Sequence, residues 1–233
     1  MAAGEDEWIE LVHRLEEAGA DMIECSMSCP QGEHSIADEG KKASNAIPAA
    51  DRELMRTTTQ TILRARKKNT PVIVKMTPNV TDLVDVARGA VEGGADALCC
   101  IDTVRGFIGI DLETGYPKLN VNGLSTWGGL SGPAVKPIAL GCVSKLTKEL
   151  DIPVAGVGGV SNWQDAAEFL LLGARNVQVC TAISRYGFGM VQSMQKGLLR
   201  YMEQKGFTSL DAMVGKSLPY LVDHSELSRD NHL

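Results

Sequence analysis

The stretch EAGADMIE, residues 17–24, ends an expected helix with a glycine and then enters a short apolar strand. EGGADALC at residues 92–99 and LGARNVQV at residues 172–179 repeat this design. Glycine at such a position supplies the left-handed backbone conformation that lets the chain leave a helix. Each interval between copies is long enough for two strand–helix units of roughly 30 residues or more. The chain is therefore predicted to repeat a β–α unit.

Apolar runs that alternate with amphipathic segments place the elements along the chain. Strands are expected at residues 21–26, 71–76, 96–102, 153–157 and 176–180. Helices are expected at residues 5–18, 51–68, 81–93, 134–150, 162–172 and 188–204. Asp51, Asn162 and the pair Thr81-Asp82 are the expected helix starts. This pattern predicts an α/β fold with a buried parallel sheet, either a TIM (β/α)8 barrel or a doubly wound open sheet.

The number of strands bears on the choice between these two folds. The first clear element is a helix, with at most residues 1–3 as the stub of an earlier strand. Five strands and a stub cannot close an eight-stranded barrel. The sequence therefore predicts either an open sheet or an incomplete barrel whose first strands are missing from this chain.

Composition narrows the class of protein. A chain of 233 residues with 44% hydrophobic residues has the size of one domain with a real core. Its net charge of −6 is spread along the chain, and no basic stripe predicts nucleic-acid binding. No apolar run approaches the roughly 20 residues of a membrane helix, and no signal peptide is evident. The six cysteines show neither CxxC pairs nor metal-ligand spacing, which predicts no metal site and a reducing, cytoplasmic location.

The turn Ser28-Cys29-Pro30 follows the first expected strand. Polar groups at the carboxyl ends of parallel strands form the active sites of α/β barrels, and a thiol there can act as an acid or base. Many cysteines are instead small buried hydrophobes. The long polar segment 31–50 follows directly and is expected to be a lid over Cys29.

Other strand ends offer an anion site. Lys75 could neutralise an anionic ring or phosphate, form a Schiff base, or simply extend to solvent. Gly158, Gly159 and Thr181 follow the last two strands, where many barrels bind phosphate. The glycine-rich turn at residues 127–132 is either a tight loop or a close approach of backbone to a flat or charged ligand.

These motifs together resemble the FMN-binding barrel of dihydropyrimidine dehydrogenases, especially the bacterial NAD-dependent catalytic subunit, within the dihydroorotate dehydrogenase superfamily. The matching stretches run in family order over nearly the whole chain: residues 19–24, 28–30, 75–80, 102–104, 128–132, 137–140, 158–160 and 178–180. The resemblance implies an incomplete TIM barrel, with residues 1–233 as a single partial FMN-binding domain.

The resemblance also implies roles for individual residues. Cys29 would be the catalytic proton donor to one carbon of a ring C=C bond, while reduced flavin delivers hydride to its neighbour. The cofactor-binding residues would be Lys75, Thr103, Gly132, Gly158, Gly159, Cys180 and Thr181. The substrate-binding residues would be Ser26, Ser28, Asp102 and Thr103.

Three positions depart from the family pattern, which carries asparagine where this chain has Gly4, Ser26 and Asp102. An amide offers both a donor and an acceptor to the imide edges of a pyrimidine. Serine keeps one hydroxyl, an aspartate anion only accepts, and glycine offers no side chain. The resemblance implies reduction of uracil or thymine to the 5,6-dihydro form, as in pyrimidine degradation. The departures leave the flavin chemistry in place and make another unsaturated ring or an enone the alternative substrate.

The remaining expectations concern partners and alternatives. No Rossmann fingerprint is present, so NAD(P)H is expected to act through an iron–sulfur flavoprotein partner subunit, and the protein is expected to be an oligomer. No iron–sulfur module is present, and the chain looks shortened at both ends. The alternatives are a dihydroorotate dehydrogenase, a Schiff-base lyase that uses Lys75, and an inactive truncated fragment.

Overall fold

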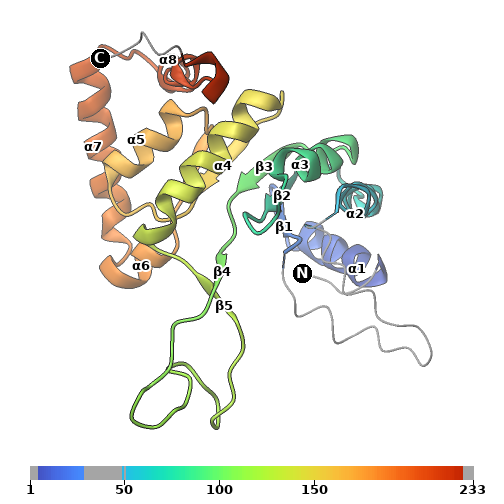
Figure 1. The fold of residues 1–233 in the computed structure, drawn as a ribbon. Helices are drawn as coiled ribbons and strands as arrows, with labels where there is room; N and C mark the ends of the chain where they lie inside the picture. Colours follow the sequence, from blue (N-terminus) through green and yellow to red (C-terminus); the bar gives the residue numbers. More distant parts are fainter. Residues whose placement is uncertain (1–4, 29–48, 50, 228–233) are drawn as a thin grey trace.

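The structure is a computed structural model that describes residues 5–28, 49 and 51–227. Gly4, Cys29 and nearly all of the expected lid at 31–50 lie outside these residues. The described chain forms a curled sheet with helices packed around it and a long arm that extends from one end (Figure 1). None of the helices described is long and apolar enough to cross a bilayer.

Five parallel strands form the main sheet, in the order β1-β2-β3-β6-β7. They are β1 (Ile23–Ser26), β2 (Val72–Met76), β3 (Ala97–Cys100), β6 (Val154–Val157) and β7 (Asn176–Gln178). In the register, Ser26 lies opposite Lys75, and Lys75 lies opposite Cys99. The prediction of five parallel strands is confirmed. The strands described do not close into a barrel.

The helices alternate with these strands as predicted. The longer ones are α1 (Glu5–Glu17), α2 (Arg52–Ala65), α3 (Leu83–Glu92), α4 (Lys136–Glu149), α5 (Trp163–Leu171) and α7 (Gly189–Lys205). Asp51, Asp82 and Asn162 cap α2, α3 and α5, each accepting a hydrogen bond from a first-turn backbone N–H. The shorter ones are α6 (Thr181–Tyr186), α8 (Leu210–Met213), η3 (Pro133–Val135), η4 (Leu218–Tyr220) and η5 (His224–Glu226).

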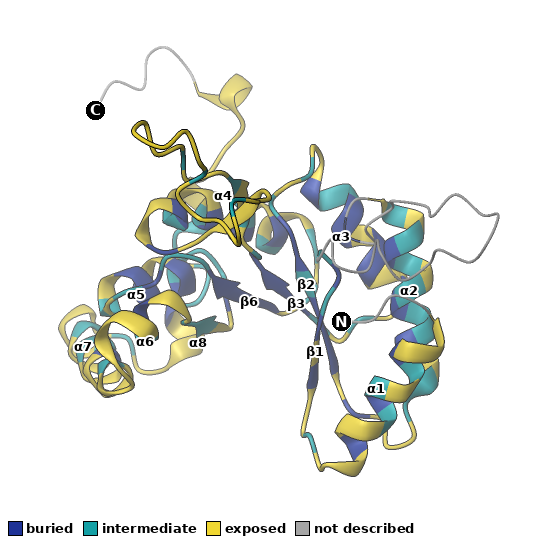
Figure 2. Ribbon diagram, turned by 90° about the horizontal axis from the view of Figure 1, so that it is seen from below, coloured by how far each residue is buried: buried dark blue, intermediate teal, exposed yellow. Residues whose placement is uncertain are grey.

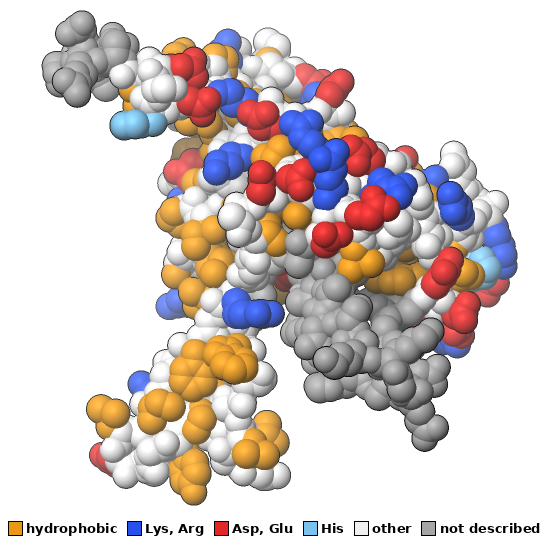
Figure 3. All heavy atoms as spheres, turned by 45° about the vertical axis from the view of Figure 1, so that its right-hand side comes forward, with side chains coloured by type: hydrophobic (Ala, Val, Ile, Leu, Met, Phe, Trp, Pro, Cys, Tyr) orange, Lys and Arg blue, Asp and Glu red, His pale blue; other side chains and the backbone are white. Residues whose placement is uncertain are grey.

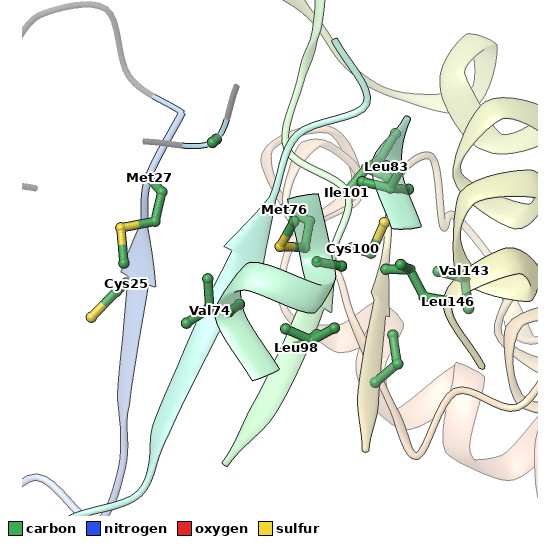
Figure 4. Close-up of a cluster of buried hydrophobic side chains, with 14 of the residues drawn as sticks. Cys25, Met27, Val74, Met76, Leu83, Leu98, Cys100, Ile101, Val143 and Leu146 are labelled. Carbon is green, nitrogen blue, oxygen red and sulfur yellow. The ribbon is translucent and has the colours of Figure 1, made fainter. Parts of the chain in front are cut away.

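The main core lies between the sheet and its helices, on one face of the sheet (Figure 2). Alternate residues of β2 show why: Val74 and Met76 point into this core, while Ile73 belongs to a separate cluster on the other face. Cys99 and Cys100 divide between the two faces in the same way, as their adjacency predicts. Figure 4 shows the side chains that β1, β2 and β3 contribute to the helix-covered core. The opposite face, here called the inner face, carries only the smaller apolar cluster of Ile73 among the described residues and leaves room for polar side chains.

A second, antiparallel pair of strands was not predicted. β4 (Val104–Gly106) pairs with β5 (Gly128–Leu130), so part of the expected glycine-rich turn is a strand. We call residues 104–130 the arm. It carries many exposed apolar side chains, which gather on its surface in Figure 3: Phe107, Ile108, Ile110, Leu112, Tyr116, Leu119, Val121, Leu124, Trp127 and Leu130. The arm leaves the sheet directly after Asp102 and Thr103, and so it borders the strand ends.

Candidate functional site

Charged and polar side chains meet on the inner face of the sheet. Lys75 Nζ of β2 donates to Glu24 Oε1 of β1 at 3.1 Å. Gln178 Nε2 of β7 donates to the other oxygen of Glu24 at 2.5 Å, and Cys99 Sγ of β3 donates to Gln178 Oε1 at 3.4 Å. Strand alternation places these side chains on the face opposite the core, so the network spans the sheet from β1 to β7.

The Lys75 ammonium is held in its charged form. Burial opposes that charge, but the carboxylates of Glu24 and Asp102 favour it, and the pKa of Lys75 is raised. Burial also raises the pKa of the Cys99 thiol well above its ordinary value, so this neighbour is neutral. A lysine that acts as a Schiff-base nucleophile needs the neutral amine. The electrostatics of Lys75 therefore favour a fixed positive charge over a nucleophile.

A second cluster lies at the ends of β1 and β3. Ser26 Oγ donates to Asp102 Oδ2 at 3.1 Å, and Ser28 Oγ donates to the same oxygen. The backbone N–H of Thr103 donates to Asp102 Oδ1 at 2.7 Å. Ser26, Ser28 and Asp102 are each partly buried. The structure thus brings together four residues that the sequence assigned to one substrate group.

Asp102 is ionised in this environment. Burial alone would raise its pKa, but the hydrogen bonds from Ser28, the Thr103 backbone and Ser26, together with the charge of Lys75, lower it overall. A carboxylate accepts hydrogen bonds and donates none. The hydroxyl hydrogens of both serines are therefore directed at Asp102.

The arm is attached beside this cluster. Asn79 Nδ2 donates to the Thr103 carbonyl at 2.9 Å, and the Arg105 N–H donates to Asn79 Oδ1 at 2.8 Å. On the facing strand, a Cβ added to Gly129 would lie 2.6 Å from the Thr103 Cβ. Such close packing requires glycine and fixes β5 against the end of β3.

Glycines from two loops meet the first residue of α6 beside the arm. A Cβ on Gly159 would lie 2.8 Å from the Gly132 carbonyl oxygen and 2.9 Å from the Lys136 nitrogen, and Gly159 has φ of +75°. Thr181 Oγ1 donates to Ser131 Oγ at 2.9 Å, and its methyl group lies beside Gly132. We call Gly132, Gly158, Gly159 and Thr181 the glycine corner.

Lys136 behind the glycine corner is already neutralised. Its Nζ lies 2.6 Å from Asp165 Oδ1 and 2.8 Å from Glu168 Oε2. The Ser161 N–H donates to the second oxygen of Asp165 at 2.8 Å. These contacts join the start of α4 to α5 and so hold the Gly158-Gly159 loop in place.

Lys75 lies in the inner-face network with Glu24, and most of the other sequence-predicted residues fall into two neighbouring groups. Ser26, Ser28, Asp102 and Thr103 form one, and the glycine corner forms the other, with the 128–132 segment between them. Cys180 precedes α6 and is exposed. Cys29 lies outside the described residues. Glu24, Asn79 and Gln178 were missed as site residues, although strand alternation already placed Glu24 on the same face as Ser26.

Comparison with known proteins gives consistent matches. The family model of dihydroorotate dehydrogenase matches residues 1–202. The NAD-dependent dihydropyrimidine dehydrogenase subunit PreA of Escherichia coli (strain K12) is 41% identical over 233 residues, covering 98% of this chain and 54% of that protein. The chloroplastic dihydropyrimidine dehydrogenase (NADP(+)) of Arabidopsis thaliana is 36% identical over 226 residues, covering 94% of this chain and 51% of that protein.

A relative with a different printed name also matches. The catalytic subunit of dihydroorotate dehydrogenase B (NAD(+)) of Methanothermobacter thermautotrophicus is 43% identical over 198 residues. This match covers 84% of the chain and 60% of that protein. The chain spans about half the length of the dihydropyrimidine dehydrogenase relatives that it matches.

Proposed function

This chain belongs to the dihydroorotate dehydrogenase family, and from that premise we propose that it binds FMN and reduces a C=C bond in a ring substrate. The reaction class is that of its dihydropyrimidine dehydrogenase relatives. The observation that carries the proposal is the meeting of the ionised Asp102 cluster and the charged Lys75 at the carboxyl ends of neighbouring strands. This edge of a parallel sheet is where α/β enzymes bind their ligands.

The residues present fit FMN. Gly159 packs so closely against Gly132 and Lys136 that a Cβ would collide with backbone, so only glycine fits at this turn. The bare backbone of glycine suits a phosphate group. The Lys75 ammonium gives one hydrogen bond to Glu24 and keeps other N–H groups that can donate to the flavin ring. The residues proposed to hold the cofactor are Lys75, Thr103, Cys180 and the glycine corner.

Hydride exchange with a ring carbon is the chemistry that bound FMN supplies. Cys29 is proposed to give its Sγ proton to the neighbouring carbon, and to take that proton back in the reverse direction. This role depends on the resemblance of Ser28-Cys29-Pro30 to the family motif. Ser26, Ser28 and Asp102 are proposed to orient the ring.

The Schiff-base alternative is less well supported. Glu24 pairs with Lys75 at 3.1 Å, and the raised pKa keeps the ammonium protonated. A dihydroorotate dehydrogenase activity remains the second candidate, because relatives with that printed name match most of the chain. The electrons are proposed to come from NAD(P)H through a partner subunit, since the names of several relatives describe them as subunits.

The test is a visible spectrum of the purified protein after incubation with FMN and desalting. A retained flavin spectrum is expected, followed by bleaching with dithionite and re-oxidation by a ring substrate. Uracil, thymine and orotate should be compared as oxidants. Cys29→Ala should retain the flavin and lose re-oxidation, while Cys142→Ala serves as the matched control. A protein that folds but retains no flavin would contradict the proposal.

A further inference from the structure

Resting on the proposed function, we infer that this site selects a ring whose edge presents N–H donors, such as an aminopyrimidine or a cyclic amidine, over an imide ring. The inference is about the chemical class of substrate. It follows from the hydrogen-bond accounting and charges around Asp102.

The hydroxyl hydrogens of Ser26 and Ser28 are already committed to Asp102. Asp102 Oδ2 accepts from both Ser26 and Ser28, and each serine has one hydroxyl hydrogen. Asp102 Oδ1 accepts from the Thr103 N–H. A carboxylate offers about four lone-pair positions, so about one remains on Oδ1. What these side chains still offer to a ligand is therefore lone pairs: one on Asp102 and those on the two serine oxygens.

The local charge also favours a ligand that donates hydrogen bonds. Lys75 is paired with Glu24, so its positive charge is already balanced by a carboxylate at 3.1 Å. Cys99 is a neutral thiol and Gln178 carries no charge. The negative charge of Asp102 is thus the net charge of this set of side chains. A half-buried carboxylate interacts more strongly with a donor than a solvent-exposed one does, because water screens it less.

An imide edge is a poor complement to such a surface. It places one N–H between two carbonyl oxygens, and each oxygen would face a lone pair of the cluster. Replacing one carbonyl by an amino group turns that repulsion into a charge-assisted hydrogen bond, which is roughly twice as strong as a neutral one. Asp102 would then discriminate between rings of the same size and the same C=C bond.

The experiment compares uracil with isocytosine, which carries an amino group in place of the C2 carbonyl oxygen. The N3–H tautomer of isocytosine presents two adjacent donors. Both rings are titrated into the FMN-loaded protein by flavin difference spectra, and into the flavin-free protein by calorimetry. We expect isocytosine to bind at least about tenfold more tightly than uracil. Asp102→Asn should reduce or reverse this preference, because an amide presents either a donor or an acceptor.

The matched control is Asp21→Asn, which removes an exposed carboxylate before β1, at the opposite end of that strand. It should leave the preference unchanged. Equal binding, tighter binding of uracil, or no binding of either ring by the wild-type protein would overturn the inference. The comparison of the two rings with the wild-type protein does not depend on Asp102→Asn. The inference is therefore tested even if that variant folds poorly. Loss of flavin with a retained calorimetric preference would instead contradict the proposed function.

Discussion

Gln178 of β7 donates a hydrogen bond to Glu24 of β1 at 2.5 Å, although these are the two outermost strands of the five-stranded sheet. Neighbouring strands lie about 4.8 Å apart, so the edges of a flat sheet of five strands would be about 19 Å apart. Two side chains cannot span that gap. The sheet must therefore curl strongly around its inner face, which brings the ends of all five strands toward one site.

Glu24→Gln should release Lys75 from its counter-ion. Burial lowers the pKa of Lys75, and the Glu24 carboxylate opposes this effect. Without the carboxylate, the pKa of Lys75 should therefore fall. The pH dependence of acetic anhydride labelling, followed by peptide mass spectrometry, measures this change. Glu17→Gln is the matched control, because Glu17 pairs with Lys67 at 4.0 Å on the exposed surface. An unchanged Lys75 profile in Glu24→Gln would contradict the assigned role of Glu24.

Gly159→Ala should abolish FMN retention. The new Cβ would meet the Gly132 carbonyl and the Lys136 nitrogen, and φ of +75° is itself unfavourable for alanine. We expect a loss of about 1–2 kcal/mol of unfolding free energy from the backbone, and about 1–3 kcal/mol more from overpacking. Urea denaturation and the flavin spectrum measure the two effects.

Gly206→Ala provides the control for that variant. Gly206 ends α7 with φ of +72°, but no atom lies within 4 Å of its added Cβ. It should lose only the backbone contribution and should retain FMN as the unmodified protein does. If both variants lost FMN equally, the glycine corner would not be the phosphate site.

Much of the fold could be predicted because its signals are local. Apolar runs predicted the five parallel strands. Asp51 and Asn162 cap the helices that were expected to begin there. The arm escaped prediction because β5 reads Gly-Gly-Leu, which has neither the alternation nor the β-branched residues of a strand. The pairing of Glu24 with Gln178 escaped because the two lie 154 positions apart, and the curl that joins them is a property of the whole sheet.

The candidate site, like the fold, could be predicted from the sequence only in part. The family resemblance grouped Ser26, Ser28 and Asp102, and the predicted parallel strands explain why they meet, since the carboxyl ends of such strands share one edge. Sequence could not show that both serines donate to a single Asp102 oxygen, because that depends on side-chain orientation across β1 and β3. The roles of these residues in binding remain predictions.

Glu16→Gln should weaken the fold near neutral pH. Glu16 is buried and accepts hydrogen bonds from the Lys67 and Lys68 backbone N–H groups and from the Thr70 hydroxyl. The Lys67 N–H contributes most, and although burial opposes it, the pKa of Glu16 lies below its ordinary value. A glutamine would turn an NH2 donor toward one of these donors.

The pH dependence of this contribution has a definite sign. Because the folded state depresses the pKa of Glu16, its stabilisation is complete above the ordinary carboxyl range and is lost as pH falls through the lower folded value. Thermal unfolding of wild type and Glu16→Gln should therefore differ most near neutral pH and converge as the pH falls below the ordinary carboxyl range. Glu17→Gln, at the exposed neighbouring position, should track wild type throughout. If the unfolding temperatures of Glu16→Gln and wild type differed by the same amount at every pH, the ionised state of Glu16 would not be what stabilises the fold.

Gly129→Ala should push β5 away from Thr103 and loosen its pairing with β4, whereas Gly128→Ala should not. A Cβ at Gly129 would collide with the Thr103 side chain, but at the adjacent Gly128 nothing lies within 4 Å. The collision should cost about 1–3 kcal/mol of unfolding free energy or be relieved by separation of β5 from β4. Amide hydrogen exchange at residues 104–106 and 128–130 distinguishes these results. Thr103→Ala in the Gly129→Ala background keeps a Cβ but removes the hydroxyl and methyl groups, and so should restore part of the protection. If protection were lost equally in the two glycine variants, close packing on Thr103 would not be what holds the arm.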